Sequence, residues 1–168
     1  MLAARRSEGL RSLALLGPTG LGLPLDHMVA LKKPDFTAPA DIQAEVQKHN
    51  LLAIMISRPE HVDALSLYLQ TENTKRSRLA SHIFALGDEC ARAIAMLQCP
   101  VASFWGAEDI ARFYFAERRA LFARLSPGGP FHVIPDAGHW VQYEAAPVFN
   151  RLFMAWLAKS IPAPALIS

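Results

Sequence analysis

The sequence predicts an α/β fold, in which a partial parallel sheet has flanking helices and an all-helical segment separates its first two strands. Three short, mostly apolar runs indicate strands that are covered on both faces, as the strands of parallel sheets usually are. Helical apolar spacing lies between and after these runs. The chain has 168 residues, of which 52% are hydrophobic, and this is enough for one domain with a packed core.

The predicted strands are Leu13–Leu16, residues 101–105 and residues 132–134. A glycine or a proline directly follows each of them, and both residue types interrupt a strand readily. Because the runs are short and show no strict alternation of polar and apolar residues, we expect the strands to lie in one parallel sheet. Residues 1–6 are interpreted as the end of a helix that precedes the first strand.

Two helices are predicted after the second strand. Residues 110–125 form the first, with Asp109 at or near its N-cap and with Phe113 and Phe122 among its core contacts. The last helix follows the third strand, and Pro147 suits its first turn. Its buried stripe has the spacing i, i+3, i+4, i+7, i+8 and consists of Phe149, Leu152, Phe153, Trp156 and Leu157.

The middle of the chain shows helical patterns and no clear strand. Residues 51–56 are ambiguous and are interpreted as part of a buried helix. The motif Ser57-Arg58-Pro59-Glu60 predicts a capping box. The helix that follows is expected to bury Ala64, Leu65, Tyr68 and Leu69. An all-helical insert of this kind is typical of a cap or lid, so we expect residues 1–24 and 88–168 to form the core and residues 25–87 to form the cap.

Composition excludes several classes of protein. A net charge of +2, from 17 basic and 15 acidic side chains, argues against binding to nucleic acid. Cys90 and Cys99 have no zinc-type spacing and the histidines are scattered, so we expect no metal site. The longest apolar runs are far shorter than the roughly 20 residues that span a bilayer, so no membrane association is expected. A reduced, cytoplasmic protein is therefore predicted.

Two strand ends carry the residue types of a catalytic acid–base pair. Asp109 follows the second strand in Gly106-Ala107-Glu108-Asp109, and His139 follows the third strand in Gly138-His139. Active sites of open α/β sheets lie at the carboxyl ends of the strands, where these residues would meet. An aspartate that orients an imidazole forms two thirds of a nucleophile–His–acid triad. Either residue alone could be structural, His139 in a loop and Asp109 as a helix cap.

These motifs resemble the C-terminal half of an α/β-hydrolase. In that family the acid follows a strand as G-x-x-D and the histidine follows the last strand as G-H, while residues 13–22 resemble the strand and loop that enter the cap. Residues 138–144 and 149–152 are similar to hydrolases of aromatic-ring degradation. These include the meta-cleavage-product hydrolases, which cut carbon–carbon bonds in vinylogous diketones.

The resemblance implies hydrolysis by an activated serine, with Asp109 holding His139 and His139 acting first as general base and then as general acid. The implied substrate is a small molecule, either an ester or an aromatic-pathway diketone. Trp140 is expected to line the substrate pocket, with a core or rim aromatic as the alternative. The resemblance implies neither an organic cofactor nor a metal, and it allows a homo-oligomer of the full-length protein.

The sequence departs from the family in one respect. The family's nucleophile lies in G-x-S-x-G on a tight strand–helix turn, and no serine of this chain has those flanking glycines. In family order this turn would precede Leu13. We therefore expect the nucleophile-bearing N-terminal half to be absent from this segment, and the 168 residues alone to be inactive. A truncated reading frame, a misassigned start and a deliberate fragment would each explain this.

Alternatives remain open at this stage. Glu108 is next to the predicted acid, Asp26 could serve as the acid after an earlier strand, and Glu144 could orient the loop that holds His139. The whole chain could instead be a catalytically dead remnant or a non-catalytic binding module. An acyltransferase or a cofactor-free haloperoxidase would use the same fold. Coding sequence upstream of Met1 distinguishes the first two, because an open frame with G-x-S-x-G supports the enzyme and a stop codon supports the remnant.

Overall fold

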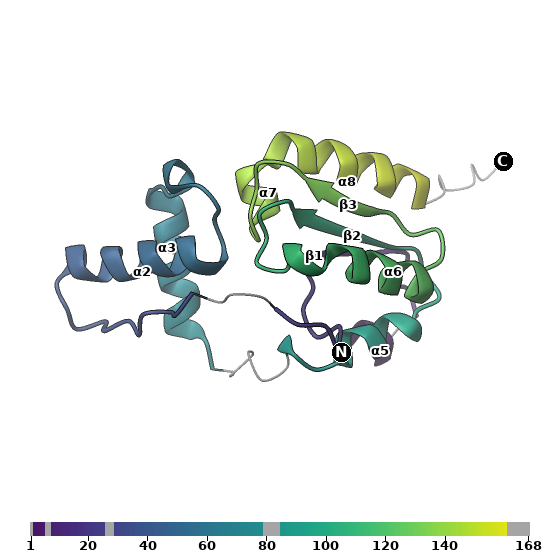
Figure 1. Ribbon diagram of the computed structural model, residues 1–168, viewed down its shortest axis with the longest axis horizontal. Coiled ribbons are helices and arrows are strands. Elements are labelled where there is room, and N and C mark those ends of the chain that lie inside the picture. The colour runs from purple at the N-terminus through teal and green to yellow at the C-terminus, as the bar shows by residue number, and fades with distance from the viewer. Residues whose placement is uncertain (1, 6–7, 26–28, 79–84, 161–168) are drawn as a thin grey trace.

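The computed structural model of the chain describes residues 2–5, 8–25, 29–78 and 85–160 and has a three-stranded parallel sheet at its centre (Figure 1). The strands are β1 (Leu13–Leu16), β2 (Val101–Gly106) and β3 (Phe131–Ile134), in the order β1-β2-β3. All three predicted strands and their parallel arrangement are confirmed. The central strand β2 is buried along its whole length, as expected for a strand with a neighbour on each side and a helical layer on each face.

Side chains of β2 alternate between two hydrophobic clusters, one on each face of the sheet. Ala102 and Phe104 pack with α8 (Ala146–Ser160), and Val101 and Trp105 pack with α5 (Glu89–Ala95) and α6 (Phe115–Leu125). Figure 1 shows these helices in layers on opposite sides of the sheet. The α/β fold class predicted from the sequence is therefore confirmed.

The predicted stripe of α8 forms most of its contact with the sheet. The ring of Phe104, which is fully buried, meets the rings of Phe149, Phe153 and Trp156 edge-on. Leu152 and Leu157 pack against the same cluster. The short helices α1 (Leu2–Arg5) and α7 (Val141–Glu144) lie before β1 and directly before α8.

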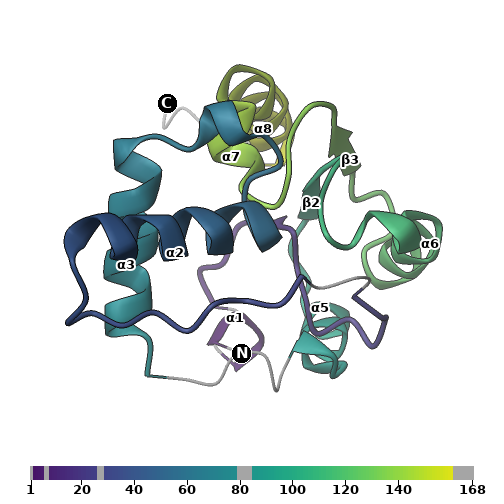
Figure 2. The ribbon, with the colours of Figure 1, turned by 60° about the vertical axis from the view of Figure 1, so that its left-hand side comes forward.

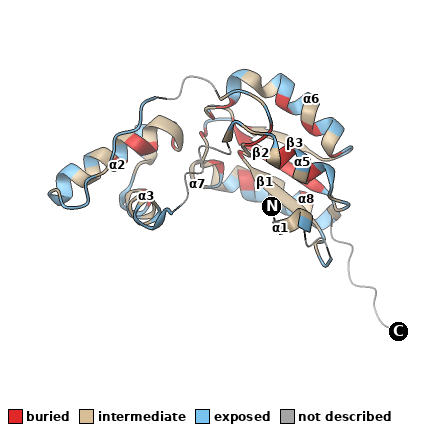
Figure 3. Cartoon of the chain, turned by 90° about the horizontal axis from the view of Figure 1, so that it is seen from below, coloured by how far each residue is buried: buried red, intermediate tan, exposed pale blue. Residues whose placement is uncertain are grey.

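The described part of the segment between β1 and α5 contains helices and no strand, and it lies to one side of the sheet (Figure 2). It consists of α2 (Ala40–Ile54), a 3₁₀ turn η1 (Pro59–His61) and α3 (Ala64–Arg76). Buried residues concentrate around the sheet, whereas α2 and α3 are mainly half-buried or exposed (Figure 3). Leu51 and Ile56 are nonetheless buried, as the interpretation of residues 51–56 as a buried helix required, although α2 ends at Ile54.

The prediction of a capping box at Ser57 is wrong, and so is the prediction of which face is buried in the helix that follows. Asp63 is the N-cap of α3: its carboxylate accepts the backbone N–H of Ser66 at 2.8 Å, and the Ser66 hydroxyl accepts the Asp63 N–H at 2.9 Å. Ser66 therefore faces inward, and Leu65 and Tyr68 are 55% and 61% exposed. Asp63 displaces Ser57 as the cap because its reciprocal bonds satisfy two free donors at once.

The helix predicted over residues 110–125 also begins later than expected. A 3₁₀ turn η2 (Arg112–Tyr114) precedes α6, which starts at Phe115. Phe113 is 54% exposed with the Arg112 guanidinium over its ring, so the predicted core contact of Phe113 is wrong, whereas that of Phe122 is confirmed. Within the described ranges, none of the helices combines the length and apolar character that crossing a membrane requires.

Candidate active site

Asp109 and His139 meet beyond the carboxyl ends of β2 and β3. Gly106 ends β2 and Ile134 ends β3, and these two residues are paired in register. The loops that follow therefore start at the same edge of the sheet. The His139 ring nitrogen Nδ1 lies 2.9 Å from Asp109 Oδ2, so the contact predicted from the sequence is present. Because a carboxylate only accepts, Nδ1 carries the proton and Nε2 presents a lone pair.

The Asp109 carboxylate is 1% exposed, and its two oxygens have different partners. Oδ1 accepts the N–H of Ala111 at 2.8 Å, which forms a turn and leaves Oδ2 for His139. Nearby, Arg118 is also buried, and it donates to the Pro24 carbonyl at 2.6 Å. Burial lowers the pKa of the Arg118 guanidinium, and the negative charge of Asp109 opposes that shift. The Arg118 guanidinium is thus near enough for its positive charge to interact favourably with the charge of Asp109.

Two glycines allow the strand ends to converge around the ring. Gly17 follows β1 at φ +51°, and a Cβ there would lie 2.6 Å from the His139 atoms Cε1 and Nδ1. At Gly106 a Cβ would lie 2.1 Å from the carbonyl oxygens of Ala137 and Gly138. Any side chain at either position would collide with the histidine or its loop. Gly17 was predicted only as the residue that stops a strand, so its role in the site was missed.

The two loops are also joined through their backbones. The N–H of Ala107 donates to the Ile134 carbonyl at 2.8 Å, and the N–H of Glu108 donates to the Ala137 carbonyl at 2.9 Å. Asp136 turns the histidine loop with a φ of 59°, a conformation that aspartate tolerates better than most residues. These hydrogen bonds hold the histidine loop in a fixed position relative to the loop that bears Asp109.

A second buried carboxylate, Glu144, holds the histidine loop from the other side. Its side chain has no exposed surface and accepts the N–H of Gly138 at 2.6 Å. It also accepts hydrogen bonds from the N–H and the hydroxyl of Ser57 and from His61 Nδ1, each at 3.0 Å, and from the Arg58 N–H at 3.3 Å. The geometry agrees with the expected role of Glu144 in orienting the loop. Ser57 was missed as a partner because it was interpreted as a helix cap, and no role was assigned to His61 from the sequence.

Opposing effects set the pKa of Glu144. Burial by itself raises this pKa, but the hydrogen bonds from His61, Gly138 and Ser57 outweigh burial and hold the pKa below its ordinary value. The carboxylate is therefore ionised at neutral pH and can accept all of these donors. No hydrogen bond in the described part of the chain joins Glu144 to the ring of His139. Glu144 therefore does not compete with Asp109, the predicted acid, for that ring.

A cavity of about 280 Å³ adjoins His139. Apolar side chains line one part of it, namely Val29, Ile110 and residues 52–56 at the end of α2. Ser57, Glu108 and Arg112 line it beside the histidine, so that more of its lining surface is polar than apolar. Trp140 is not among the residues that line this cavity. Its ring instead contacts Tyr143, with 5.9 Å between ring centroids. The backbone N–H of Trp140 donates to the Met55 carbonyl at 2.8 Å. A substrate contact by Trp140 remains a prediction.

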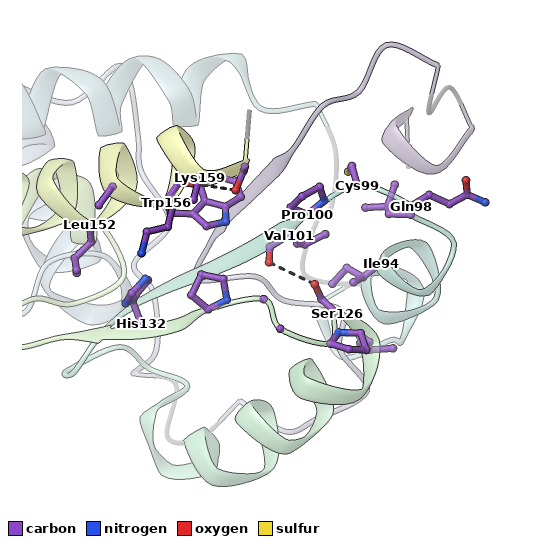
Figure 4. Close-up of a pocket in the computed structure, with 18 residues that line it drawn as sticks. Ile94, Gln98, Cys99, Pro100, Val101, Ser126, His132, Leu152, Trp156 and Lys159 are labelled. Atoms are coloured by element: carbon purple, nitrogen blue, oxygen red, sulfur yellow. Dashed lines mark hydrogen bonds between the residues drawn. The ribbon is translucent and has the colours of Figure 1, made fainter. Parts of the chain in front are cut away.

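A larger cavity of about 810 Å³ lies at the opposite edge of the sheet, where β2 and β3 begin (Figure 4). Val101, His132, Trp156 and Lys159 are among the residues that line it, together with Ser126, whose hydroxyl bonds the Val101 carbonyl. No hydrogen bond between a nucleophile and a base is found there within the described residues. The smaller cavity is therefore the better candidate for chemistry, because it lies at the carboxyl edge and contains the ring of His139.

The other predicted acids do not compete with Asp109 in this structure. Glu108 is 57% exposed at its side chain and lies 3.9 Å from Arg112 rather than at the histidine. Asp26 lies outside the described residues. No cluster of three or more histidine, cysteine, aspartate or glutamate side chains suited to a metal ion is found in the part of the chain that the structure describes.

Comparisons with known proteins agree with this geometry. The sheet, the helical layers and the paired loops define the α/β-hydrolase fold, which the chain shares with solved structures. One of them is a meta-cleavage product hydrolase from Pseudomonas fluorescens, with a TM-score of 0.66 and 20% identity over 95% of this chain and 60% of that chain. No family model matches the sequence.

Comparison of the sequence with curated proteins shows similarity to the same kind of hydrolase. A 2-hydroxy-6-oxo-6-phenylhexa-2,4-dienoate hydrolase of Burkholderia cepacia is 27% identical over 153 residues, which are 86% of this chain and 53% of the relative. A 2-hydroxy-6-oxononadienedioate/2-hydroxy-6-oxononatrienedioate hydrolase of Comamonas testosteroni is 26% identical over 90% of this chain and 55% of the relative. The chain thus spans about half the length of these relatives, which fits the predicted resemblance to the C-terminal half of such a hydrolase.

We predict that Gly17→Ala destabilises the chain much more than Gly9→Ala. Both glycines have a positive φ, +51° and +80°, so both variants incur backbone strain of about 1–2 kcal/mol. Only the new methyl group at residue 17 meets the His139 ring, since a Cβ at residue 9 has no neighbour within 4 Å. The overlap adds about 1–3 kcal/mol. Urea unfolding of the two variants measures the difference, and equal losses would contradict the packing described for Gly17.

We predict that Glu144→Gln lowers the free energy of unfolding at pH 7 by about 1–3 kcal/mol, because buried donors lose a charged acceptor. The pKa of Glu144 is lowered on folding from 4.5, so its contribution is complete above pH 4.5 and is lost as pH falls through the folded-state pKa. Urea unfolding of wild type and variant at decreasing pH should show the difference shrinking. Glu60→Gln, an exposed change of the same kind, serves as control. A difference that stays constant down to the lowest pH at which both fold would refute the assignment.

Proposed function

We propose that the chain supplies the acid and the histidine of a serine-nucleophile α/β-hydrolase that acts on an aromatic-pathway diketone or an ester. The observation that carries this proposal is the 2.9 Å hydrogen bond between His139 Nδ1 and the buried Asp109, beside a cavity that the His139 ring lines. The names of the curated relatives support the substrate class, because they are hydrolases of oxo-dienoate and related acids.

In the proposed mechanism Asp109 keeps the proton of His139 on Nδ1, so that Nε2 is free to accept a proton. The serine hydroxyl loses its proton to Nε2 as its oxygen attacks the substrate carbonyl carbon. The imidazolium that forms is stabilised by the Asp109 charge and then returns the proton to the leaving group. The acyl group then remains on the serine oxygen as an ester. Water attacks this ester and gives its proton to Nε2, which passes the proton to the serine oxygen as the carboxylic acid product leaves. The 280 Å³ cavity combines apolar side chains such as Val29 and Ile110, which suit the hydrocarbon part of an aromatic-pathway substrate, with polar and charged groups such as Arg112, which suit its oxygen atoms.

The nucleophile has to come from a G-x-S-x-G segment that these 168 residues do not contain. Ser57 is the only serine of the described residues that lines the cavity, and its hydroxyl donates to Glu144 rather than to His139. A hydroxyl bound to a carboxylate that already has four other donors is poorly placed to be activated by the imidazole. The 168-residue segment alone is therefore proposed to be inactive.

The second candidate is a non-catalytic module that keeps Asp109 and His139 without turnover. The observation in its favour is the same lack of G-x-S-x-G within the 168 residues. Coding sequence in frame upstream of Met1 distinguishes the two candidates. A strand–helix turn with G-x-S-x-G favours the hydrolase, and an immediate stop codon favours the module.

For the hydrolase we further propose a cytoplasmic location and a small molecule as its only obligatory partner. Cys90 and Cys99 are both free thiols, which suits a reducing compartment. A hydrolase in the cytoplasm would meet there a substrate that is made and consumed during the breakdown of aromatic compounds.

We predict that adding a nucleophile creates turnover that depends on the pair. In a chimera, the part of the Burkholderia cepacia relative that precedes its matched region would be joined to this chain. The chimera should cleave 2-hydroxy-6-oxo-6-phenylhexa-2,4-dienoate or an aryl ester. Asp109→Asn and His139→Ala should each lower kcat by about 10³-fold or more. The matched control Asp136→Asn changes an exposed acid of the histidine loop and should leave kcat within about 2-fold, as a surface substitution does.

Residues 1–168 without the added segment should show no turnover above buffer. Turnover by the chimera that survives His139→Ala would contradict the proposed role of the histidine. Turnover by residues 1–168 alone that His139→Ala abolishes would contradict the external nucleophile.

A further inference from the structure

We propose that Glu144 is a positioning residue that couples the cap turn, defined here as residues 55–61 between α2 and α3, to the ring of His139. The inference rests on the proposed function in one respect, namely that His139 is the catalytic base. It adds a residue to the site that acts through the backbone of the histidine loop and not on the substrate.

The backbone on both sides of His139 is held from the cap turn. The N–H of Gly138 donates to Glu144 at 2.6 Å, and Glu144 in turn accepts the N–H of Ser57. The N–H of Trp140 donates directly to the Met55 carbonyl at 2.8 Å. The three-residue segment 138–140 is thus attached at each end to the cap turn, while the ring between them is attached to Asp109. A shift of the cap turn therefore acts on the ring from both flanks.

The cap turn and residues 138–140 are packed closely against each other. A Cβ added to Gly138 would lie 3.0 Å from the backbone nitrogen of Ser57, 3.1 Å from the Met55 carbonyl oxygen and 3.0 Å from Glu144 Oε2. Backbone atoms of the cap turn thus lie almost in contact with backbone atoms of the histidine loop. Close-packed atoms transmit displacement because no side chain is available to absorb it.

A carboxylate is the side chain that this junction requires. Glu144 offers two oxygens with about four acceptor sites, and five donors from Gly138, Ser57, Arg58 and His61 bind to them. A glutamine of the same shape has one acceptor oxygen, and its NH₂ group would face an N–H donor. A neutral replacement therefore fills the space but releases part of the network.

Other contacts join residues next to these two segments, but they are exposed. Arg58 pairs with Asp136, with side chains 44% and 72% exposed, and the Tyr143 hydroxyl donates to Asp63 at 2.6 Å. Exposed pairs of this kind contribute about 0–1 kcal/mol. Glu144 is the buried group of the junction, so the coupling is assigned to it and not to these outer contacts.

The test uses the full 168-residue chain, labelled with ¹⁵N and studied by NMR as wild type and as the variants Glu144→Gln, His61→Ala and both together. Two signals are followed, the exchange rate of the Gly138 amide and the ring nitrogens of His139. Glu144→Gln should speed the exchange of the Gly138 amide by about 10-fold or more, since a bond to a charged acceptor contributes about 1.5–3 kcal/mol. It should also move the His139 ring signals, while the control Glu60→Gln moves neither.

The distant substitution separates coupling from simple stabilisation. His61→Ala alone should shift the His139 ring signals in the wild-type background and should add nothing in the Glu144→Gln background, because the route through Glu144 is then broken. A folded Glu144→Gln chain with unchanged His139 signals would overturn the inference. Equal effects of His61→Ala in both backgrounds would also overturn it. If Glu144→Gln does not fold, His61→Ala and Ser57→Ala decide the matter, since each leaves the carboxylate in place and should still move the His139 signals.

Failure of this inference is distinguishable from failure of the proposed function. In wild type the His139 ring nitrogens report whether Nδ1 carries the proton that Asp109 accepts. If they show the proton on Nδ1 and Glu144→Gln leaves them unchanged, only the role of Glu144 is lost. If wild type lacks that proton on Nδ1, the acid–base pair itself is lost.

Discussion

A carboxylate that is 1% exposed has to be compensated, and at Asp109 this requirement organises the candidate site. The His139 ring and the Ala111 N–H satisfy its two oxygens. The ring has to reach the carboxylate past Gly17, which lies against it without a side chain. One buried charge thus brings together residues that follow three different strands, and the parallel sheet makes this possible because all three strands end at the same edge.

The two buried carboxylates of the site have different tasks. Asp109 acts on the ring of His139 directly, whereas Glu144 acts on the backbone beside it and reaches the cap turn at Ser57. The first contact lies just beyond the carboxyl ends of β2 and β3, and the second crosses to the turn between α2 and α3. A substrate that moved the helical segment could in this way act on the histidine without touching it, which is a physical basis for the coupling that we propose.

The sequence was informative wherever a local signal was unambiguous. Glycine or proline after each apolar run marked the strands, and the parallel sheet placed Asp109 beside His139. The partners of Glu144 could not be predicted, because Ser57 lies 87 residues away in the chain and its local pattern also suits a helix cap. The choice of Asp63 over Ser57 as cap followed from the reciprocal bonds between Asp63 and Ser66, a local pair that the interpretation of the sequence passed over. The outward position of Leu65 followed from that choice, since the start of a helix sets which face is buried.

The proton on the His139 ring tests the account most directly. ¹⁵N NMR of the ring nitrogens in the neutral ring, assigned by comparison with His139→Ala, shows which nitrogen carries it. The account predicts the proton on Nδ1 in wild type, because Asp109 Oδ2 lies 2.9 Å away, and a mixture of the two forms in Asp109→Asn. A wild-type ring with its proton on Nε2, or ring signals that Asp109→Asn leaves unchanged, would contradict it.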